Sequence, residues 1–266
     1  MKILNGSELA GFIKERQAHQ VSMILQTKKI VPKLAIILCG DNPASVKYVS
    51  LKDKYSSDIG IQTEIYNIDQ SSAIELIEKL NNDDSVHGII VQLPLPDITR
   101  TEDIVSHIAS NKDVDSLTDN SDIDSATATA ILWLLAGYNI NMLGKNVVIV
   151  GQGKLVGEPL RKMLEASGIY PKVITIATEN TDEILSEADV IITAVGKPGI
   201  LHEKNIPLGV VVVDAGVASE DGMLKGDVAD SVYKNRDDLT ITPTIGGVGP
   251  LTICALFDNV IRACQK

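Results

Sequence analysis

A tyrosine and a lysine that could take part in acid–base chemistry stand four residues apart, at Tyr48 and Lys52. In a helix this spacing places both side chains on one face. A partly desolvated lysine changes its pKa readily, so Lys52 could transfer protons as a neutral amine or stabilise negative charge as an ammonium. The sequence leaves both roles open, and a Tyr–Lys pair on a helix is more often an ordinary surface pair.

Two further polar side chains could join this pair. Gln92 interrupts the apolar run Ile89-Ile90-Val91-Gln92-Leu93, and Asp115 ends the segment Lys112-Asp113-Val114-Asp115. A polar amide in an apolar strand needs a hydrogen-bond partner, and Lys52 could supply it. We expect the alternating carboxylates at the mouth of the same cleft. The plainer alternatives are a satisfied edge residue for Gln92 and solvated turn residues for the aspartates.

A glycine-rich segment indicates a second kind of chemistry. Residues 146–157 read Asn-Val-Val-Ile-Val-Gly-Gln-Gly-Lys-Leu-Val-Gly. Four branched apolar residues predict a buried parallel strand, and Gly151 and Gly153 then allow a tight turn and close approach of a ligand. The helix that follows would point its unpaired N–H groups at an anion. The spacing is one residue longer than the usual dinucleotide fingerprint, and a purely structural turn is the alternative.

An acidic residue stands where such a site would hold a ribose. A second strand, at about 172–177, leads to Glu179, roughly 20 residues beyond the glycines as expected of a dinucleotide fold. A carboxylate there would accept from the ribose 2′-OH of NAD and would repel the 2′-phosphate of NADP. A solvated loop carboxylate is the alternative for Glu179.

Composition narrows the class of protein. The chain has 266 residues, 44% of them hydrophobic, and a net charge of −11, which argues against binding nucleic acid or an anionic membrane surface. Three cysteines and four scattered histidines show no metal-ligand spacing, so we expect no metal site and reduced thiols. The start of the chain turns polar at once and no apolar run reaches membrane-spanning length, so we expect a cytoplasmic protein.

Strands that alternate with helices predict an α/β fold with parallel sheets. Strands are expected at 34–38, 62–67, 88–93, 147–150, 173–176, 190–194, 210–213 and 239–241. Helices are expected at 7–26, 42–59, 72–81, 101–108, 126–135 and 250–264. In the first helix, Leu9, Phe12, Ile13 and Val21 are expected to face inward.

We predict two lobes. The first is an α/β substrate lobe over 1–124, with the terminal helix at 250–266 packing back on it. The second is a Rossmann-type doubly wound cofactor lobe over 125–249. Ligands would lie in the cleft beyond the carboxyl ends of both sets of strands.

Four blocks in this order resemble the bifunctional methylenetetrahydrofolate dehydrogenase/methenyltetrahydrofolate cyclohydrolase family, over nearly the whole chain. They are Gly40-Asp41-Asn42-Pro43-Ala44-Ser45-x-x-Tyr48-Val49-x-x-Lys52-x-Lys54, His87-Gly88-Ile89-Ile90-Val91-Gln92-Leu93-Pro94-Leu95-Pro96, Lys112-Asp113-Val114-Asp115 and Gly246-Gly247-Val248-Gly249-Pro250-Leu251-Thr252. The resemblance implies oxidation of 5,10-methylenetetrahydrofolate with NAD or NADP, and then hydrolysis of the methenyl product to 10-formyltetrahydrofolate. It also implies one-carbon metabolism, which serves purine biosynthesis, and a homodimer formed through the cofactor lobe.

The resemblance also implies site residues. Lys52 would be the central catalytic group, Tyr48 would orient the folate, Gln92 would hold Lys52 and Asp115 would bind the pterin edge. The folate contacts would be Tyr48, Val49, Lys52, Val91, Gln92, Leu93, Asp115, Gly246, Gly247, Val248, Gly249 and Pro250. The cofactor contacts would be Gly151, Gln152, Gly153, Lys154, Glu179, Val217 and Thr127.

The chain departs from the family pattern at four places. The usual Gly-Arg-Ser is Gly151-Gln152-Gly153, and the usual serine after the second strand is Glu179, so we predict NAD over NADP. If NADP were preferred, Lys154 would be the residue to suspect. Pro-Cys-Thr-Pro beside the nicotinamide pocket is replaced at 125–128, where Thr127 alone is kept. Ser116 stands where the family has glycine, and the Pro-Val-Pro before the glycine loop becomes residues 243–245.

Two other functions stay open at this stage. Another two-lobed dehydrogenase, resembling the shikimate dehydrogenases, would explain the glycine motif but not Tyr48, Lys52, Gln92 and Asp115 together. A dinucleotide- or folate-binding module without turnover would explain the altered 125–128 segment.

Overall fold

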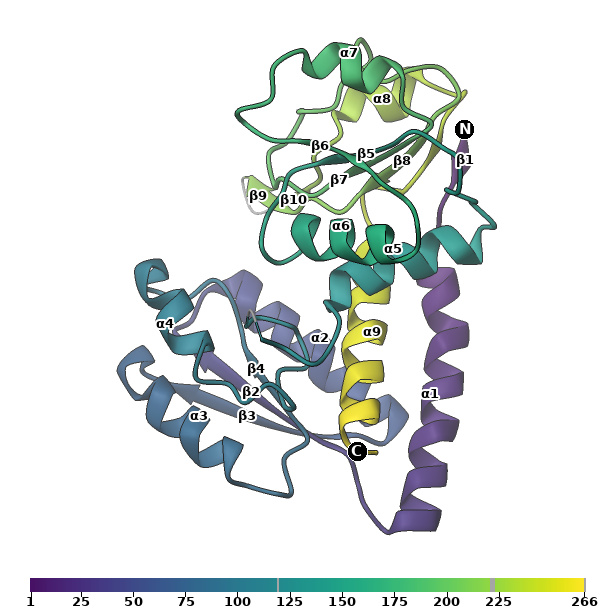
Figure 1. The fold of residues 1–266 in the computed structure, drawn as a ribbon. Coiled ribbons are helices and arrows are strands. Elements are labelled where there is room, and N and C mark those ends of the chain that lie inside the picture. Colours follow the sequence, from purple (N-terminus) through teal and green to yellow (C-terminus); the bar gives the residue numbers. More distant parts are fainter. Residues whose placement is uncertain (119, 221–222, 266) are drawn as a thin grey trace. The chain divides into compact units, whose positions relative to one another are not determined.

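The chain forms two compact units that are each built from separate stretches of sequence. The computed structural model describes residues 1–118, 120–220 and 223–265 (Figure 1). One unit comprises Met1–Ala10 and Thr127–Thr252, and the other comprises Gly11–Ala126 and Ile253–Lys266. We call them the six-stranded unit and the three-stranded unit after their main sheets. The chain therefore crosses between units three times, within the helices α1 (Gly6–Lys28), α5 (Ala126–Gly137) and α9 (Val248–Ala263).

The three-stranded unit is a parallel α/β sheet in the order β3-β2-β4. Its strands are β2 (Lys33–Cys39), β3 (Gln62–Ile68) and β4 (Gly88–Val91), and its helices include α2 (Pro43–Ile59), α3 (Ala73–Asn81) and α4 (Thr101–Val105). The central strand β2 and strand β4 are almost wholly buried, as their unbroken apolar runs predict. This sheet confirms the α/β fold expected for the first half of the chain.

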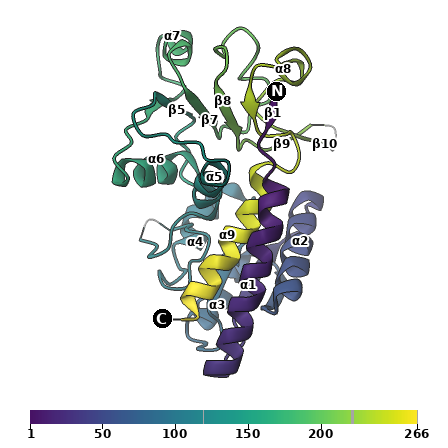
Figure 2. The ribbon, with the colours of Figure 1, turned by 90° about the vertical axis from the view of Figure 1, so that its right-hand side faces the viewer.

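Helices α1 and α9 lie side by side in the three-stranded unit (Figure 2), so the expected return of the last helix to the first half of the chain is confirmed. The contact is partly polar, because the Gln17 amide donates to the carbonyl of Cys254 over 2.8 Å. Gln17 is 0% exposed, whereas Phe12 is 68% exposed. The inward orientation predicted for Phe12 was therefore wrong: the buried stripe of α1 runs through Gln17, Val21 and Ile24.

The six-stranded unit is a parallel sheet in the order β1-β11-β8-β7-β5-β6. Its strands are β1 (Lys2–Ile3), β5 (Val147–Val150), β6 (Lys172–Ile174), β7 (Val190–Thr193), β8 (Val211–Asp214) and β11 (Thr240–Ile241). After β5 the chain adds β6 on one side and then β7 on the other. This reversal makes the carboxyl ends of β5 and β7 a topological switch point, where open α/β sheets bind ligands.

Several elements of the six-stranded unit differ from the sequence predictions or were not foreseen. Strand β6 ends at Ile174, and a hydrogen-bonded turn at 175–178 follows it, closed by Thr178 N donating to Thr175 O. The short helices α7 (Thr181–Ser186) and α8 (Asp230–Asn235), the antiparallel pair β9 (Ala218–Glu220) and β10 (Met223–Lys225), and the two-residue strand β1 were not predicted. Among the described helices, none is long and apolar enough to cross a membrane.

Candidate active site

Helix α2 begins directly after β2 and carries Tyr48 and Lys52 near the carboxyl edge of the three-stranded sheet. Asn42 caps the helix, because its Oδ1 accepts from the backbone N–H groups of Ala44 (3.0 Å) and Ser45 (3.2 Å). Pro43 occupies the first turn, where its missing N–H costs nothing. The sequence Asn-Pro-Ala-Ser thus fixes where α2 starts and so which face presents Tyr48 and Lys52.

Lys52 and Gln92 are in direct contact, as the sequence predicted. Nζ of Lys52 donates to Oε1 of Gln92 over 3.1 Å, and Nε2 of Gln92 donates to the carbonyl of Leu93 over 2.8 Å. Gln92 is 9% exposed, and its backbone N–H donates to Ile37 O, continuing the sheet ladder beyond β4. Both ends of the amide are therefore engaged, which fixes its orientation with the oxygen toward the amine.

Lys52 and Asp115 influence each other electrostatically. Burial lowers the pKa of the Lys52 amine, and the nearby Asp115 carboxylate partly opposes that change. Burial raises the pKa of Asp115, against the stabilising charge of Lys52. The amine and the carboxylate therefore shift toward their neutral forms, which is the condition a proton-transferring group requires near neutral pH.

The segment before Asp115 is structural. Asp113 is fully buried and accepts hydrogen bonds from the backbone N–H groups of Leu117 and Thr118, so its carboxylate closes its own turn. The buried Lys112 amine donates to two carbonyls, those of Leu80 and Asp83. The expectation that both aspartates of this segment line a cleft was therefore wrong for Asp113, and Asp115 is the carboxylate that interacts with Lys52.

The other candidate folate contacts differ in how far their side chains are exposed. The side chains of Val49, Val91 and Val248 are at most 5% exposed, so a ligand could meet these residues through their backbone. Tyr48 and Leu93 are half-buried. In the six-stranded unit, Gly246 has a left-handed φ of 87°, while Gly249 and Pro250 fall in the first turn of α9.

The Gly246–Gly247 loop is held by the first residues of the chain. The backbone N–H of Ser7 donates to the carbonyl of Gly246 over 3.0 Å. A Cβ added to Gly6 would lie 1.8 Å from the carbonyl oxygen of Gly247, so the two backbones touch and glycine is required at position 6. This contact was not foreseen from the sequence, since the two segments are far apart in the chain.

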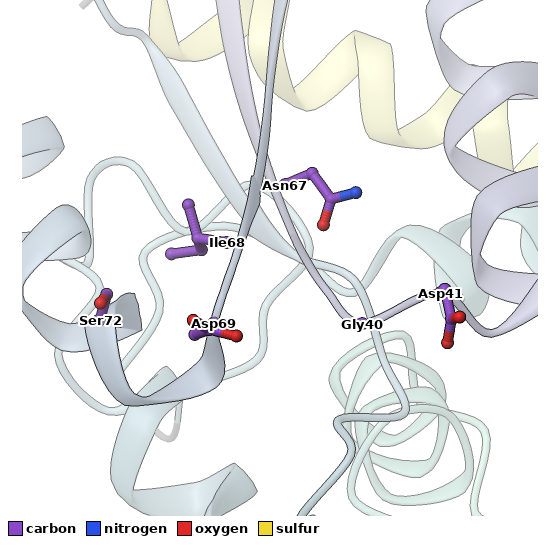
Figure 3. Close-up of a pocket in the computed structure, with 6 residues that line it drawn as sticks. All are labelled: Gly40, Asp41, Asn67, Ile68, Asp69 and Ser72. Carbon is purple, nitrogen blue, oxygen red and sulfur yellow. The ribbon is translucent and has the colours of Figure 1, made fainter.

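An open hollow of about 640 Å³ lies at the carboxyl ends of β2 and β3. Figure 3 shows its lining residues Gly40, Asp41, Asn67, Ile68, Asp69 and Ser72. Two of these are carboxylates, and neither Lys52 nor Gln92 belongs to the lining. We therefore locate the chemistry at Lys52, where an amine, an amide and a carboxylate act on one another, rather than in the hollow.

The glycine loop after β5 has the geometry of a dinucleotide-binding turn. Gly151 has a φ of 100°, and a Cβ added to Gly157 would lie 2.0 Å from the carbonyl oxygen of Gly151. Both glycines are therefore needed by the fold. Gly153 is different, because it has no positive φ and, apart from its chain neighbours, no residue has an atom within 4 Å of where its Cβ would be. Its missing side chain leaves open space beside α6 (Gly157–Ala166), which fits a nucleotide phosphate at this helix N-terminus.

The remaining cofactor candidates also belong to the six-stranded unit. Glu179 is exposed just beyond the turn that follows β6, and Gln152 and Lys154 are exposed on the glycine loop. Val217 follows β8 and is 57% exposed. Thr127 lies half-buried in the first turn of α5. Within the described ranges, no group of three or more histidines, cysteines or carboxylates could hold a metal ion.

Two aspartates of the six-stranded unit, the buried Asp227 and the half-buried Asp214, were missed by sequence reasoning. Asp227 is 0% exposed and accepts from Thr193 Oγ1 (2.6 Å), Val195 N (2.8 Å) and Lys197 N (2.7 Å).

Asp214 accepts from the backbone N–H groups of Gly216, Asp227 and Val228, and burial raises its pKa to about 6. These carboxylates fix the loops that follow β7 and β8. An aspartate that ends an apolar strand, as in Val-Val-Val-Asp, was the available signal.

Comparison with known proteins covers both units. Residues 4–115 match the family described as tetrahydrofolate dehydrogenase/cyclohydrolase, catalytic domain, and residues 125–266 match its NAD(P)-binding domain. A bifunctional protein FolD of Staphylococcus epidermidis is 37% identical over 276 residues, covering 98% of this chain and 96% of that protein. These matches favour the folate family over the shikimate dehydrogenase alternative.

Solved structures agree with the sequence matches. The bifunctional enzyme FolD of Campylobacter jejuni is similar with a TM-score of 0.92 at 37% identity, covering 100% of this chain and 99% of that one. The Trypanosoma brucei methylenetetrahydrofolate dehydrogenase-cyclohydrolase, complexed with NADP cofactor and inhibitor, gives a TM-score of 0.90 at 29% identity, with 99% and 97% coverage. The chain belongs to the tetrahydrofolate dehydrogenase/cyclohydrolase family.

Proposed function

We propose that this chain oxidises 5,10-methylenetetrahydrofolate to the 5,10-methenyl compound with a nicotinamide cofactor and then hydrolyses that product to 10-formyltetrahydrofolate. The observation that carries the proposal is the Lys52–Gln92 hydrogen bond of 3.1 Å beside Asp115, in a chain that also contains a glycine loop open to a nucleotide. When bound, the nicotinamide supplies the hydride acceptor. The three-stranded unit then provides the folate site and the six-stranded unit provides the cofactor site.

Lys52 performs the proton transfers of the hydrolysis in this proposal. Its amine takes a proton from the water whose oxygen bonds to the methenyl carbon, and its ammonium returns that proton to N5 as the bond between that carbon and N5 breaks. The hydroxyl proton left on the adduct is released to solvent as the formyl C=O forms. Gln92 keeps the amine oriented through the bond to Oε1. Asp115 receives hydrogen bonds from the pterin edge, and Tyr48, one helical turn before Lys52, orients the folate ring.

We further propose that NAD is preferred over NADP. Gln152 stands where an arginine would bind a 2′-phosphate, and the exposed Glu179 carboxylate would repel that phosphate while accepting from a ribose hydroxyl. Kinetics with both cofactors test this directly. A clear preference for NADP would end the proposal and would direct attention to Lys154.

A spectrophotometric assay separates the two activities from simple binding. Reduced nicotinamide and the methenyl intermediate are followed as separate signals after methylenetetrahydrofolate is added. Appearance and decay of the methenyl signal are expected with either cofactor that supports turnover. A chain that binds the cofactor but forms neither signal would be a non-catalytic module, which the altered 125–128 segment makes the second candidate.

The proposal includes a homodimer in the cytoplasm, formed through the six-stranded unit, as the family resemblance implies. Sedimentation equilibrium of the purified chain measures the oligomeric state. A monomer at the concentrations used for the assays would refute this part of the proposal without affecting the chemistry.

A further inference from the structure

The first side chain of the glycine loop is held by a carboxylate on the next helix. Nε2 of Gln152 donates to Oε2 of Glu158 over 2.9 Å, and Glu158 lies in the first turn of α6. Gln152 is otherwise exposed. The amide that follows Gly151 is thus already committed before any ligand arrives.

The same carboxylate also holds the arginine of α6. Nε of Arg161 donates to Oε2 of Glu158 over 2.9 Å, and one of its terminal nitrogens donates to Oε1 over 2.7 Å, which makes a bidentate pair. The other terminal nitrogen donates to Glu165 over 2.6 Å. Because Gln152 and Arg161 meet on the same oxygen of Glu158, the guanidinium lies beside the glycine loop.

Glu158 stays charged throughout the physiological range. Its hydrogen bonds to Arg161 and Gln152 lower its pKa to about 2. Lys162 adds a weaker contact at 3.8 Å. The first turn of α6 therefore presents a permanent carboxylate where the guanidinium and the amide would otherwise be available to an anion.

We propose that Glu158 is a specificity-determining residue that disfavours a phosphorylated adenine ribose. This inference rests on the proposed function, namely that the glycine loop binds a nicotinamide dinucleotide. A ribose 2′-phosphate is normally recognised by arginine and amide donors close to the loop. Glu158 withholds both Arg161 and Gln152 from that phosphate and adds a negative charge beside them. It acts together with Glu179, which follows the neighbouring strand β6.

Binding of reduced cofactors tests the proposal without turnover. Dissociation constants for NADH and NADPH are measured from the fluorescence of the reduced nicotinamide. Glu158→Gln keeps the shape of the side chain and removes its charge, while Arg161 keeps its bond to Glu165. We expect the preference for NADH over NADPH to fall by roughly fivefold to tenfold, since one negative charge near the phosphate is lost and Arg161 is released from it.

Glu165→Gln is the matched control. It changes the net charge by the same amount and removes a partner of the same arginine, but Glu165 contacts only the nitrogen of Arg161 that faces away from Glu158. The cofactor preference of this variant should stay within about twofold of the wild type. An equal shift in both variants would mean a general charge effect and would overturn the proposal.

A second variant tests directly whether Glu158 keeps a donor at position 152 from binding the 2′-phosphate. Gln152→Arg alone should gain little affinity for NADPH, because Glu158 would pair with the new guanidinium. Combined with Glu158→Gln it should gain more than the product of the two single effects. Multiplicative effects, or an unchanged preference in Glu158→Gln, would overturn the role of Glu158. A wild-type chain that binds neither cofactor would instead overturn the proposed function.

Discussion

The carboxylate of Asp227 occupies the space that a side chain on Gly216 would need: a Cβ added there would lie 2.1 Å from Cγ of Asp227. The relationship is reciprocal, because a Cβ on Gly226 would lie 2.1 Å from the carboxylate of Asp214. Gly216 thus leaves room for the carboxylate of Asp227, and Gly226 leaves room for the carboxylate of Asp214. The loop that leads to Val217 and the loop that follows β7 are therefore set by one shared arrangement.

Asp227→Ala should lower the free energy of unfolding by about 2–4 kcal/mol, because Thr193 Oγ1 and two backbone N–H groups lose their buried acceptor. Gly216→Ala should also destabilise the chain, since its methyl group displaces the carboxylate. The double variant should cost no more than Asp227→Ala alone. Urea unfolding of the four proteins measures this, and additive costs would refute the reciprocal packing.

Lys52→Met should abolish the cyclohydrolase activity while the chain stays folded. Methionine fills a similar volume, but it cannot donate to Gln92 or exchange a proton with water. Decay of the methenyl compound and far-ultraviolet circular dichroism give the two readouts. Lys47→Met, on an exposed position of the same helix, is the control and should hydrolyse normally. Unchanged hydrolysis by Lys52→Met would remove Lys52 from the mechanism.

The rate of hydrolysis should rise with pH and level off below pH 10.5, the ordinary pKa of lysine, because burial lowers the pKa of Lys52 and the neutral amine is the base. Asp115 opposes that lowering. Asp115→Asn should therefore move the midpoint of the profile to lower pH, whatever it does to the maximal rate. A shift toward higher pH, or a rate that falls as Lys52 loses its proton, would show that the charged form is the functional one.

Two glycines of the same loop should respond differently to alanine. Gly153→Ala should change the free energy of unfolding by less than about 0.5 kcal/mol, because its Cβ would enter open space, but it should weaken cofactor binding at least roughly tenfold. Gly157→Ala should destabilise the fold by about 2 kcal/mol or more, since its Cβ would meet the Gly151 carbonyl at 2.0 Å. Urea unfolding and cofactor fluorescence distinguish them. Normal cofactor affinity in Gly153→Ala would argue against a nucleotide at this loop.

Ser116→Gly should stabilise the chain by about 0.5–1 kcal/mol. Ser116 has a φ of 55°, in the left-handed region that a residue with a Cβ adopts at a cost. Ser116→Ala keeps the Cβ and should give no such gain, which makes it the control for loss of the hydroxyl. Thermal unfolding at one pH compares the three proteins. Equal stability of the glycine and serine forms would mean that the turn relaxes to accommodate the side chain.

Most strands could be predicted because their signal is local. Runs such as Val147–Val150 and Val190–Thr193 consist of branched residues bounded by turn residues, and the observed strands follow them closely. Strand β1 has two residues and no pattern to detect. The orientation of Phe12 was predicted wrongly because Gln17, a polar residue, takes the buried position through its bond to Cys254.

The candidate site likewise contains contacts that could be predicted from the sequence and contacts that could not. The Lys52–Gln92 contact was predictable, because an amide in an apolar strand demands a partner and a lysine stood at a suitable helical position. The pairing of Glu158 with Gln152 and Arg161 was not, since long side chains on a helix have several partners within reach. The packing of Asp227 against Gly216 and of Asp214 against Gly226 depends on how the loops meet in the folded unit, which the strand-end position of Asp214 does not reveal.

The pairing of β1 with β11 sets an order of events during synthesis. Lys2 and Ile3 leave the ribosome long before Thr240 and Ile241, the strand partners they require. The nascent chain must therefore carry its first strand unpaired while nearly every other element is translated. The edge of the larger sheet can close only after residues 240 and 241 have emerged.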